Sequence, residues 1–342
     1  MTVTGAAHTG GGAQQSAPPA LPQDVVITDV TLRDGGYLNG HSWTPAQRRE
    51  VVSAVAAAGV KRIEVGYVDG AGPVEVRRSG IATEAIRELA ERTDDVHVVV
   101  MARTTDRAPD LAAVGAAGVR TVRLPTSVNT VTALRDVVAR ATDAGLHTVV
   151  NLIRTSSETL ASLLRAGSEA VSMGADALCV ADSNGSLLPT SVGRIVRSLC
   201  AELPVPIGIH THDNLGLAFA NALAGLAAGA THVDASCRGI GKGGGNLELE
   251  RLLAYLQGLG RRDLQVAALE PVGTTVDKEL GIKRDQATAA QIAALGDLDY
   301  EQALGLQGLS EAASWARSLS GSTKRRADTI WALQRAHFPF GD

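Results

Sequence analysis

The sequence is poor in aromatic residues, which make up 3% of its 342 positions. Hydrophobic residues still amount to 45%, so an interior of ordinary size must be filled by Ala, Val, Leu and Ile. Basic residues are not in excess, because 32 Lys and Arg stand against 36 Asp and Glu, for a net charge of −4. A chain without a positive surplus is poorly suited to follow a phosphate backbone, so we expect no nucleic acid partner.

Cysteine is equally scarce. The three cysteines, Cys179, Cys200 and Cys237, form no CxxC pair, which argues against a disulfide framework and is typical of a reducing compartment. Cys179 and Cys237 stand in apolar, strand-like runs, so we interpret them as buried packing residues. No apolar run reaches the roughly 18 residues of a membrane span, and no membrane partner is expected. Residues 1–23 lack the basic start and apolar centre of a signal peptide, so we expect a disordered tail on a cytoplasmic protein.

A repeated pattern runs along the chain from Val25. A short β-branched run is followed by a small loop and then by an Ala- and Leu-rich stretch at helical spacing, and several of these stretches end at a glycine. The strand candidates are Val25–Asp29, Arg62–Val65, Val96–Met101, Arg120–Leu124, His147–Ile153, Ala177–Ala181, Pro206–His210 and Thr231–Ser236. Eight alternating units of this size predict an α/β fold, a (β/α)8 TIM barrel, with an open doubly wound sheet as the alternative.

The pattern stops after about Gly260. We therefore predict three parts: a disordered tail at 1–23, a catalytic TIM barrel at 24–260 and a helical C-terminal extension at 261–342. In such barrels the active site forms where the strands end and the βα loops begin. Polar residues at strand ends therefore carry the functional information.

The seventh strand candidate ends in His210 and His212. Residues i and i+2 of a strand point to the same side, so these two imidazoles can bind one cation. The first strand ends in a loop that holds Arg33, Asp34 and Tyr37. Asp34 lies one strand away from the histidines around a closed barrel, so it can add a carboxylate to the set. Mixed nitrogen and oxygen ligation suits Mn²⁺, Mg²⁺, Zn²⁺, Co²⁺ or Fe²⁺, and the ligand types do not choose among them. We expect Mn²⁺ or Mg²⁺.

A glycine-rich loop, GIGKGGGN, follows the eighth strand candidate. It contains a formal GxGxxG, but it follows the last strand instead of opening a βαβ unit, so it is not a dinucleotide fingerprint. We interpret it as a flexible loop over the metal. Its last residue, Asn246, is placed either to cap the next helix or to bind or orient groups near the metal, and both interpretations stay open.

Further polar residues stand at the ends of the other strand candidates: Glu64, Arg123, Asn151, Arg154, Asp182, Ser183 and Asn184. Among these, Arg123, Ser183 and Asn151 are candidates for substrate binding, the first two for a carboxylate. A salt bridge or a helix cap explains such residues equally well.

Several segments together resemble one family. TLRDGGY, IEVG, ADSNGSL, HTHDNLGLAFANALAGLAAGATHVDAS and GIGKGGGNLELE resemble the DRE-TIM metallolyase superfamily, which includes 4-hydroxy-2-oxovalerate aldolase, HMG-CoA lyase, isopropylmalate synthase and homocitrate synthase. The resemblance spans the barrel and favours the 4-hydroxy-2-oxovalerate aldolase-like branch. It implies that Asp34, His210 and His212 hold the metal, that Asn246 completes or supports that set, and that Arg33 stabilises an enolate oxygen.

Two departures limit what the resemblance implies. Where the aldolase has a catalytic histidine three residues after the metal-binding aspartate, this chain has Tyr37. The aldolase's C-terminal region, with a catalytic tyrosine and a docking surface for an aldehyde dehydrogenase, is not recognisable after Gly260, so that partner is doubtful. A homodimer or a higher oligomer is expected.

The expected reaction forms or cleaves a carbon–carbon bond through the enolate of a pyruvate-like 2-oxo acid held at the metal, with an aldehyde or an acyl donor as the second substrate. Arg33 adds positive charge where the enolate forms. Tyr37 is the candidate base, with His41 and Glu64 as alternatives. Two other functions stay open: a Claisen-type synthase that condenses an acyl-CoA, and a catalytically silent scaffold barrel. The intact metal set argues against the scaffold, and the compact tail argues against a feedback-controlled synthase.

Overall fold

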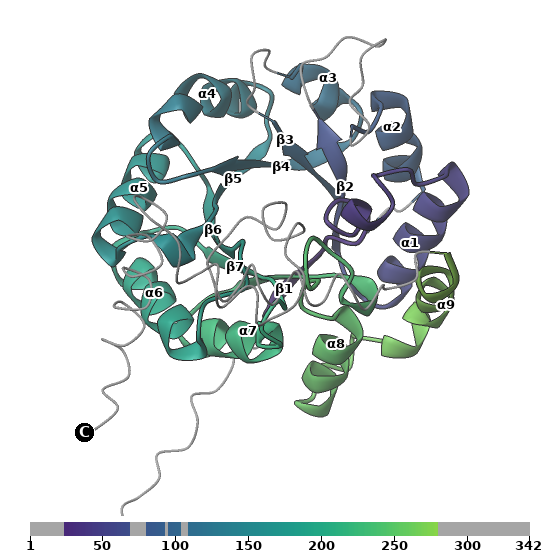
Figure 1. Cartoon of the computed structure of the whole chain (residues 1–342). Helices are drawn as coiled ribbons and strands as arrows, with labels where there is room; N and C mark the ends of the chain where they lie inside the picture. The colour runs from purple at the N-terminus through teal and green to yellow at the C-terminus, as the bar shows by residue number, and fades with distance from the viewer. Residues whose placement is uncertain (1–23, 69–79, 93–94, 104–108, 280–342) are drawn as a thin grey trace, which may run out of the picture.

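Eight parallel strands form a closed barrel in a computed structural model of the chain, which describes residues 24–68, 80–92, 95–103 and 109–279 (Figure 1). The strands are β1 (Val26–Asp29), β2 (Arg62–Val68), β3 (His97–Ala102), β4 (Val119–Thr126), β5 (His147–Leu152), β6 (Ala177–Asp182), β7 (Ile207–Thr211) and β8 (His232–Ala235). The first strand pairs with β2 and with β8, which closes the sheet. The predicted TIM barrel is confirmed, and the doubly wound alternative is wrong.

Helices surround the barrel and alternate with its strands. They are α1 (Pro45–Ala57), α2 (Thr83–Glu91), α3 (Leu111–Ala116), α4 (Arg135–Asp143), α5 (Leu160–Ser172), α6 (Pro189–Glu202), α7 (Ala218–Ala227), α8 (Leu249–Gly258) and α9 (Glu270–Glu279). Short 3-10 turns are η1 (Gly35–Leu38), η2 (Val131–Leu134), η3 (Thr155–Ser157), η4 (Cys237–Gly239) and η5 (Val266–Leu269). Among the described residues, none of the helices has the length and apolar character needed to cross a bilayer.

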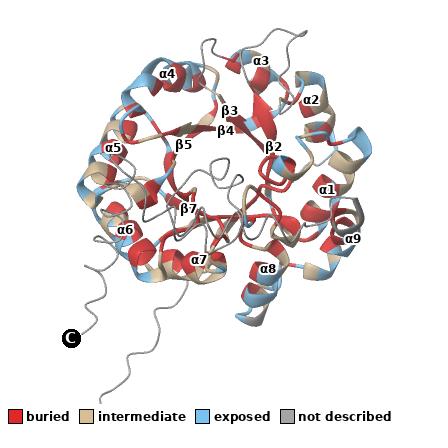
Figure 2. Cartoon of the chain, viewed as in Figure 1, coloured by how far each residue is buried: buried red, intermediate tan, exposed pale blue. Residues whose placement is uncertain are grey.

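The interior is aliphatic, as the scarcity of aromatic residues predicts. The strands and the inner faces of the helices are buried, while the outer faces of the helices are exposed (Figure 2). Cys179 and Cys237 are buried and free, which agrees with their predicted packing role. Burial raises the pKa of the Cys179 thiol to about 12, so it stays protonated at neutral pH.

The loop after β1 is fixed from behind by Trp43. Its buried indole donates a hydrogen bond from Nε1 to the carbonyl oxygen of Leu32, at 2.8 Å. The next helix, α1, begins with a capping box between Thr44 and Gln47 and has Pro45 in its first turn, so its start is sharply defined. These contacts hold the segment between β1 and α1, which carries the predicted catalytic residues, in one conformation.

The second strand runs three residues further than its predicted end at Val65. Its register with β3 shifts between Glu64 and Tyr67, which marks a bulge. Bulges change the direction in which the following side chains point. As a result Tyr67, which no motif in the sequence marks, lines the cavity at the carboxyl end of the barrel.

The chain continues to pack on the barrel after α8. Helix α9 lies beside α1 (Figure 1), where Val272 and Val276 are buried and the Thr275 hydroxyl donates to Glu50 Oε1 at 2.9 Å. The remainder of the predicted C-terminal extension, 280–342, lies outside the described residues, as does the predicted tail. The predicted domain boundaries therefore stay predictions.

Candidate active site

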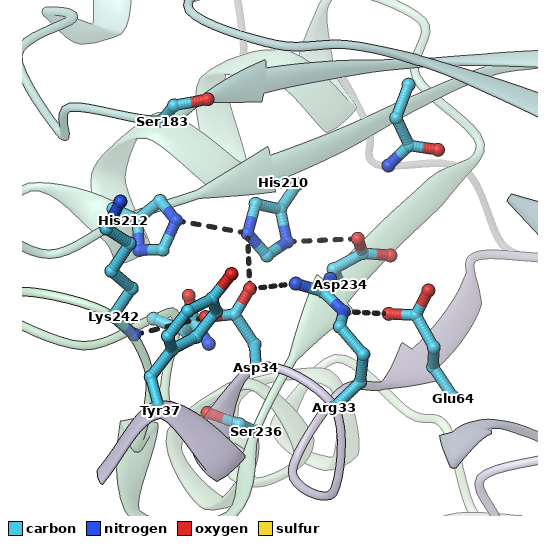
Figure 3. A network of polar contacts seen from close by, with 12 residues as sticks. Arg33, Asp34, Tyr37, Glu64, Ser183, His210, His212, Asp234, Ser236 and Lys242 are labelled. Carbon is cyan, nitrogen blue, oxygen red and sulfur yellow. Dashed lines mark hydrogen bonds and ion pairs between the residues drawn. The ribbon is translucent and has the colours of Figure 1, made fainter. Parts of the chain in front are cut away.

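Three predicted metal ligands meet at the carboxyl end of the barrel (Figure 3). Asp34 follows β1, His210 lies in β7, and His212 follows β7 directly. One ligand atom from each of these buried residues lies within 4.8 Å of the others. The distance from His210 Nε2 is 3.3 Å to His212 Nε2 and 3.5 Å to Asp34 Oδ2.

Hydrogen bonds on the far side of each ring define which nitrogen carries the proton. His210 Nδ1 lies 3.0 Å from Asp234 Oδ2, and His212 Nδ1 lies 3.1 Å from the carbonyl oxygen of Gly245. Both partners only accept, so each ring donates from Nδ1 and presents a bare Nε2. Two bare nitrogens and a carboxylate oxygen that face one another repel, unless a cation lies between them. The donor set therefore fits a divalent metal ion.

Neighbouring charges and burial keep Asp34 and His212 in the protonation state that a metal requires. Burial would raise the pKa of Asp34, but Arg33 and the two histidines outweigh it and hold that pKa well below its usual range. Burial is also the main reason why the pKa of His212 falls to about 4. At neutral pH the carboxylate is therefore ionised and the His212 imidazole is neutral.

Asn246 is also brought to this site. Helix α8 begins at Leu249 with Glu248 as its N-cap, so the helix-capping interpretation of Asn246 is wrong. The Asn246 amide donates from Nδ2 to Ile240 O at 3.0 Å, while its Oδ1 is buried without a hydrogen-bond partner. The backbone of Asn246 also forms an isolated antiparallel β-bridge with that of His212. A buried amide oxygen without a partner, on a residue whose backbone pairs with that of His212, is a candidate fourth ligand, although Asn246 does not line the cavity.

The glycine-rich loop after β8 holds this arrangement in place. The Gly245 carbonyl accepts from His212, and the backbone N–H of Lys242 donates to Asp34 Oδ1 at 3.1 Å. A Cβ at residue 245 would lie 2.2 Å from the Gly239 carbonyl oxygen, and Gly245 has a φ of 97°, so only glycine fits. The glycines therefore have a defined role, because they let the loop backbone approach the metal set. The sequence predicted only a flexible loop at this position.

Arg33 stands beside the metal set and lines the cavity. Its Nε donates to Glu64 Oε2 at 2.7 Å, and its Nη1 donates to Asp34 Oδ2. Among the described residues, Nη2 of Arg33 makes no hydrogen bond that would compete for a ligand. A guanidinium fixed on two edges with a third nitrogen available is suited to stabilise an oxyanion at the metal.

A second layer of charges lies below the ligands, where Glu64 and Arg123 are both buried. Arg123 donates from Nη2 to Asp234 Oδ2 at 2.5 Å, from Nε to Asn151 Oδ1 at 3.2 Å and from Nη1 to Glu64 Oε2 at 3.4 Å. Neither Glu64 nor Arg123 lines the cavity. Arg123 therefore does not lie where a substrate carboxylate would bind, and Glu64, held between two guanidiniums, is poorly suited to act as a base.

The cavity over the metal set has a volume of about 290 Å³. Of the predicted substrate-binding residues, Asn151 and Ser183 line it. The Ser183 hydroxyl accepts a hydrogen bond from the backbone N–H of Arg154 at 2.9 Å. Both residues are thus placed to contact a small molecule bound at the metal.

Two tyrosines form one wall of the cavity. The hydroxyls of Tyr37 and Tyr67 lie 3.0 Å apart, and Tyr37 is 42% exposed, so it can be reached from solvent. Burial raises the pKa of Tyr67 above its ordinary value, which keeps it a neutral phenol. His41 packs against both rings but does not line the cavity, and burial with nearby Arg103 lowers its pKa to about 4. A neutral, half-buried imidazole outside the cavity favours a packing role for His41.

The comparisons with known proteins agree with this geometry. The HMGL-like family matches residues 24–277. Similar curated proteins include the 4-hydroxy-2-oxovalerate aldolases of Geobacillus genomosp. 3, 33% identical over 78% of this chain and 82% of that protein, and of Roseiflexus sp. (strain RS-1), 36% identical over 68% and 70%. The N-terminal domain of a candidate aldolase from Bacteroides vulgatus has a TM-score of 0.74 at 21% identity, covering 86% of this chain and 99% of that one. The HMG-CoA lyase of Bacillus subtilis has a TM-score of 0.66 at 19% identity, covering 78% and 98%. These two structures share the fold.

Proposed function

This chain belongs to the HMGL-like family, and from that premise we propose that it cleaves or forms a 4-hydroxy-2-oxo acid by an aldol reaction. It is a metal-dependent carbon–carbon lyase of the aldolase type, like its curated relatives. The observation that carries the proposal is the convergence of Asp34, His210 and His212 beside Arg33 in one cavity. A 2-oxo acid offers a carboxylate and a ketone, which are oxygen donors that such a centre binds.

Asp34, His210 and His212 would hold the ion, with Asn246 as a fourth ligand. When bound, a divalent cation supplies Lewis acidity to the carbonyl of the 2-oxo acid. The mixture of imidazole, carboxylate and amide oxygen favours Mn²⁺ or Mg²⁺, with Zn²⁺ or Co²⁺ as alternatives. A homo-oligomeric state and a cytoplasmic location stay predictions from the sequence.

We assign the chemistry on the organic substrate to Arg33 and the tyrosine pair. In cleavage, the C4 hydroxyl passes its proton through Tyr37 to solvent, the C3–C4 bond breaks, and its electrons pass into the enolate of the 2-oxo acid. C3 of the enolate then takes up a proton from water to give pyruvate. The available Nη2 of Arg33 donates to the oxygen on which this negative charge collects. Tyr37 exchanges the proton at O4, and the Tyr67 hydroxyl, 3.0 Å away, fixes the direction of that hydrogen bond.

Pyruvate release tests this function directly. The protein is stripped of metal, reloaded with Mn²⁺ or Mg²⁺ and incubated with a panel of 4-hydroxy-2-oxo acids, while pyruvate is followed by a coupled reductase. A parallel reaction contains acetyl-CoA and a 2-oxo acid, and free CoA is measured. Metal-dependent pyruvate release without CoA release supports the aldolase, and CoA release alone would replace it by the Claisen-type synthase.

A further inference from the structure

Most of the charged side chains that line the cavity are basic. Among the described residues that line it, four carry a positive charge, namely Arg33, Arg103, Arg154 and Lys242. The only carboxylate among them is Asp34, which belongs to the metal set. A bound divalent ion would add to this positive potential. Anionic groups are therefore favoured as ligands of this cavity.

Two of the four cations follow strands that lie opposite the strands carrying the metal set. The metal ligands come from β7 and from the end of β1, which both adjoin β8, whereas Arg103 follows β3 and Arg154 follows β5. In a closed ring of eight strands, β3 to β5 face β7 to β1 across the barrel. We call Arg103 and Arg154 the distal arginines.

Arg103 is held in place by an aromatic ring. Its guanidinium carbon lies 3.9 Å from the centroid of the Tyr67 ring, and Tyr67 is itself fixed by its hydrogen bond with Tyr37. The backbone N–H of Arg103 donates to the Val68 carbonyl at 2.9 Å. A stacked guanidinium keeps its in-plane N–H groups available for an anion, so this contact prepares the side chain for binding.

Arg154 occupies a costly backbone conformation. Its φ of 57° and ψ of 37° are left-handed, where glycine is favoured and a long side chain is rare. Two hydrogen bonds stabilise this backbone conformation. The Arg154 N–H donates to the Ser183 hydroxyl, and the Ser157 N–H donates to the Arg154 carbonyl at 3.1 Å. Such strain is found mainly where a side chain has a function. Here it places an arginine, instead of a glycine, at the rim of the cavity.

We propose that the distal arginines bind a second anionic group, a carboxylate or a phosphate, at the end of the substrate that is remote from the metal. The inference rests on the proposed aldol reaction and names its electrophile as an anionic aldehyde. In condensation, C3 of the 2-oxo acid loses a proton and bonds to the aldehyde carbon, and the aldehyde oxygen gains a proton. The product is a 4-hydroxy-2-oxo acid that is anionic at both ends.

Matched pairs of small molecules test this proposal. Aldol condensation with pyruvate is measured for butanal against succinic semialdehyde, which have equal chain length, and for glycolaldehyde against its phosphate. The two anionic members separate a carboxylate from a phosphate. Binding is measured independently by calorimetry on the metal-loaded protein with 2-oxopentanoate and 2-oxoglutarate, which differ only in a terminal methyl or carboxylate.

The variants are Arg103→Gln and Arg154→Gln, with Arg135→Gln as the control, because Arg135 pairs with Glu169 on the outer surface and its side chain is 61% exposed. A charge-assisted hydrogen bond changes affinity by roughly 10- to 100-fold. We expect kcat/KM to favour one anionic aldehyde by at least about 10-fold. Each distal variant should lower kcat/KM for that aldehyde by a similar factor, leave the neutral partner nearly unchanged, and weaken 2-oxoglutarate but not 2-oxopentanoate binding.

Two results would overturn the inference. One is an equal kcat/KM for the charged and the neutral aldehyde in both pairs. The other is that Arg103→Gln and Arg154→Gln change kcat/KM for the charged and the neutral aldehyde by the same factor. An absence of aldol product with every aldehyde would instead contradict the proposed reaction. In that case the calorimetric comparison still decides the role of the distal arginines, since equal affinities for 2-oxoglutarate and 2-oxopentanoate would exclude a second anion site.

Discussion

His210 Nδ1 lies 3.0 Å from Oδ2 of Asp234, and Arg123 Nη2 lies 2.5 Å from the same oxygen. One carboxylate thus orients an imidazole of the proposed metal site and neutralises a buried guanidinium. Burial opposes its ionisation, yet Arg123 and His210 lower the pKa of Asp234 to about 2. The charge that fixes the His210 tautomer is therefore permanent at physiological pH.

Replacement of that carboxylate should weaken metal binding. An amide in Asp234→Asn can present N–H to Nδ1, which favours the wrong tautomer and takes the lone pair away from the metal side. Loss of such an orienting partner typically costs about 10- to 100-fold in metal affinity. Calorimetric titration with Mn²⁺ measures it. The control is Asp176→Asn, because Asp176 precedes β6 at the amino end of the strands, where it accepts a hydrogen bond from the Thr148 backbone N–H at 2.7 Å. An equal loss in both variants would contradict the role of Asp234.

Arg33→Lys should keep the metal and lose turnover. A lysine ammonium cannot donate to Glu64, Asp34 and an oxyanion from fixed directions at once. We expect kcat to fall by about 10²–10³, the usual effect of removing one oxyanion contact. Metal content and steady-state rates are measured on the same preparation. Turnover near that of the unmodified protein would remove Arg33 from the mechanism.

The tyrosine pair should control proton transfer and not metal binding. Tyr37→Phe removes the hydroxyl that exchanges the proton at O4, whereas Tyr67→Phe removes only its hydrogen-bond partner. We expect the larger loss of kcat in Tyr37→Phe, with unchanged Mn²⁺ affinity in both. Exchange of the C3 protons of pyruvate into deuterated water and the rate of cleavage are compared by NMR. If both rates persist in Tyr37→Phe, its hydroxyl only lines the cavity.

Stability should fall in mildly acidic solution because of His232. Burial, together with Arg62, lowers its pKa to about 4, so the folded state keeps the imidazole neutral. The unfolded chain takes up a proton near pH 6.5, so the stabilisation is full above that pH and is lost as the pH falls toward 4. Allowing for partial exposure, the loss is about 1–2 kcal/mol. Urea unfolding between pH 7 and 5 should show a smaller decline for His232→Gln; identical declines would contradict the assignment.

The sequence predicts the barrel because the alternation of β-branched and helical runs is a local property of the chain. The metal set is predictable for a related reason: His210 and His212 have the i, i+2 spacing of one strand face, and Asp34 stands at a strand end. The position of Asn246 after the last strand makes it a candidate from the sequence. The choice between metal ligand and helix cap required the structure, in which α8 begins at Leu249.

The positions of other site residues could be found only from the three-dimensional structure. Asp234 lies inside β8, two residues before the strand gives way to the loop, and only the pairing of β7 with β8 puts it beside His210. Tyr67 reaches the cavity through a bulge that no local pattern marks. Arg123 stands near the end of the predicted strand Arg120–Leu124, but β4 continues to Thr126, and the Arg123 guanidinium lies in the layer of charges with Glu64 and Asp234, outside the cavity. Depth within a barrel depends on register between distant segments, which a single sequence does not reveal.

The proposed cleavage of a 4-hydroxy-2-oxo acid requires one divalent ion, held by Asp34, His210 and His212. The most direct measurement titrates Mn²⁺ into chelator-treated protein while pyruvate release and bound metal are followed together, in the unmodified chain and in His212→Ala. We predict that activity rises in proportion to occupancy, reaches its maximum at one ion per chain, and is absent together with the ion in His212→Ala. Full pyruvate release from metal-free protein, or full metal occupancy in His212→Ala, would contradict the account.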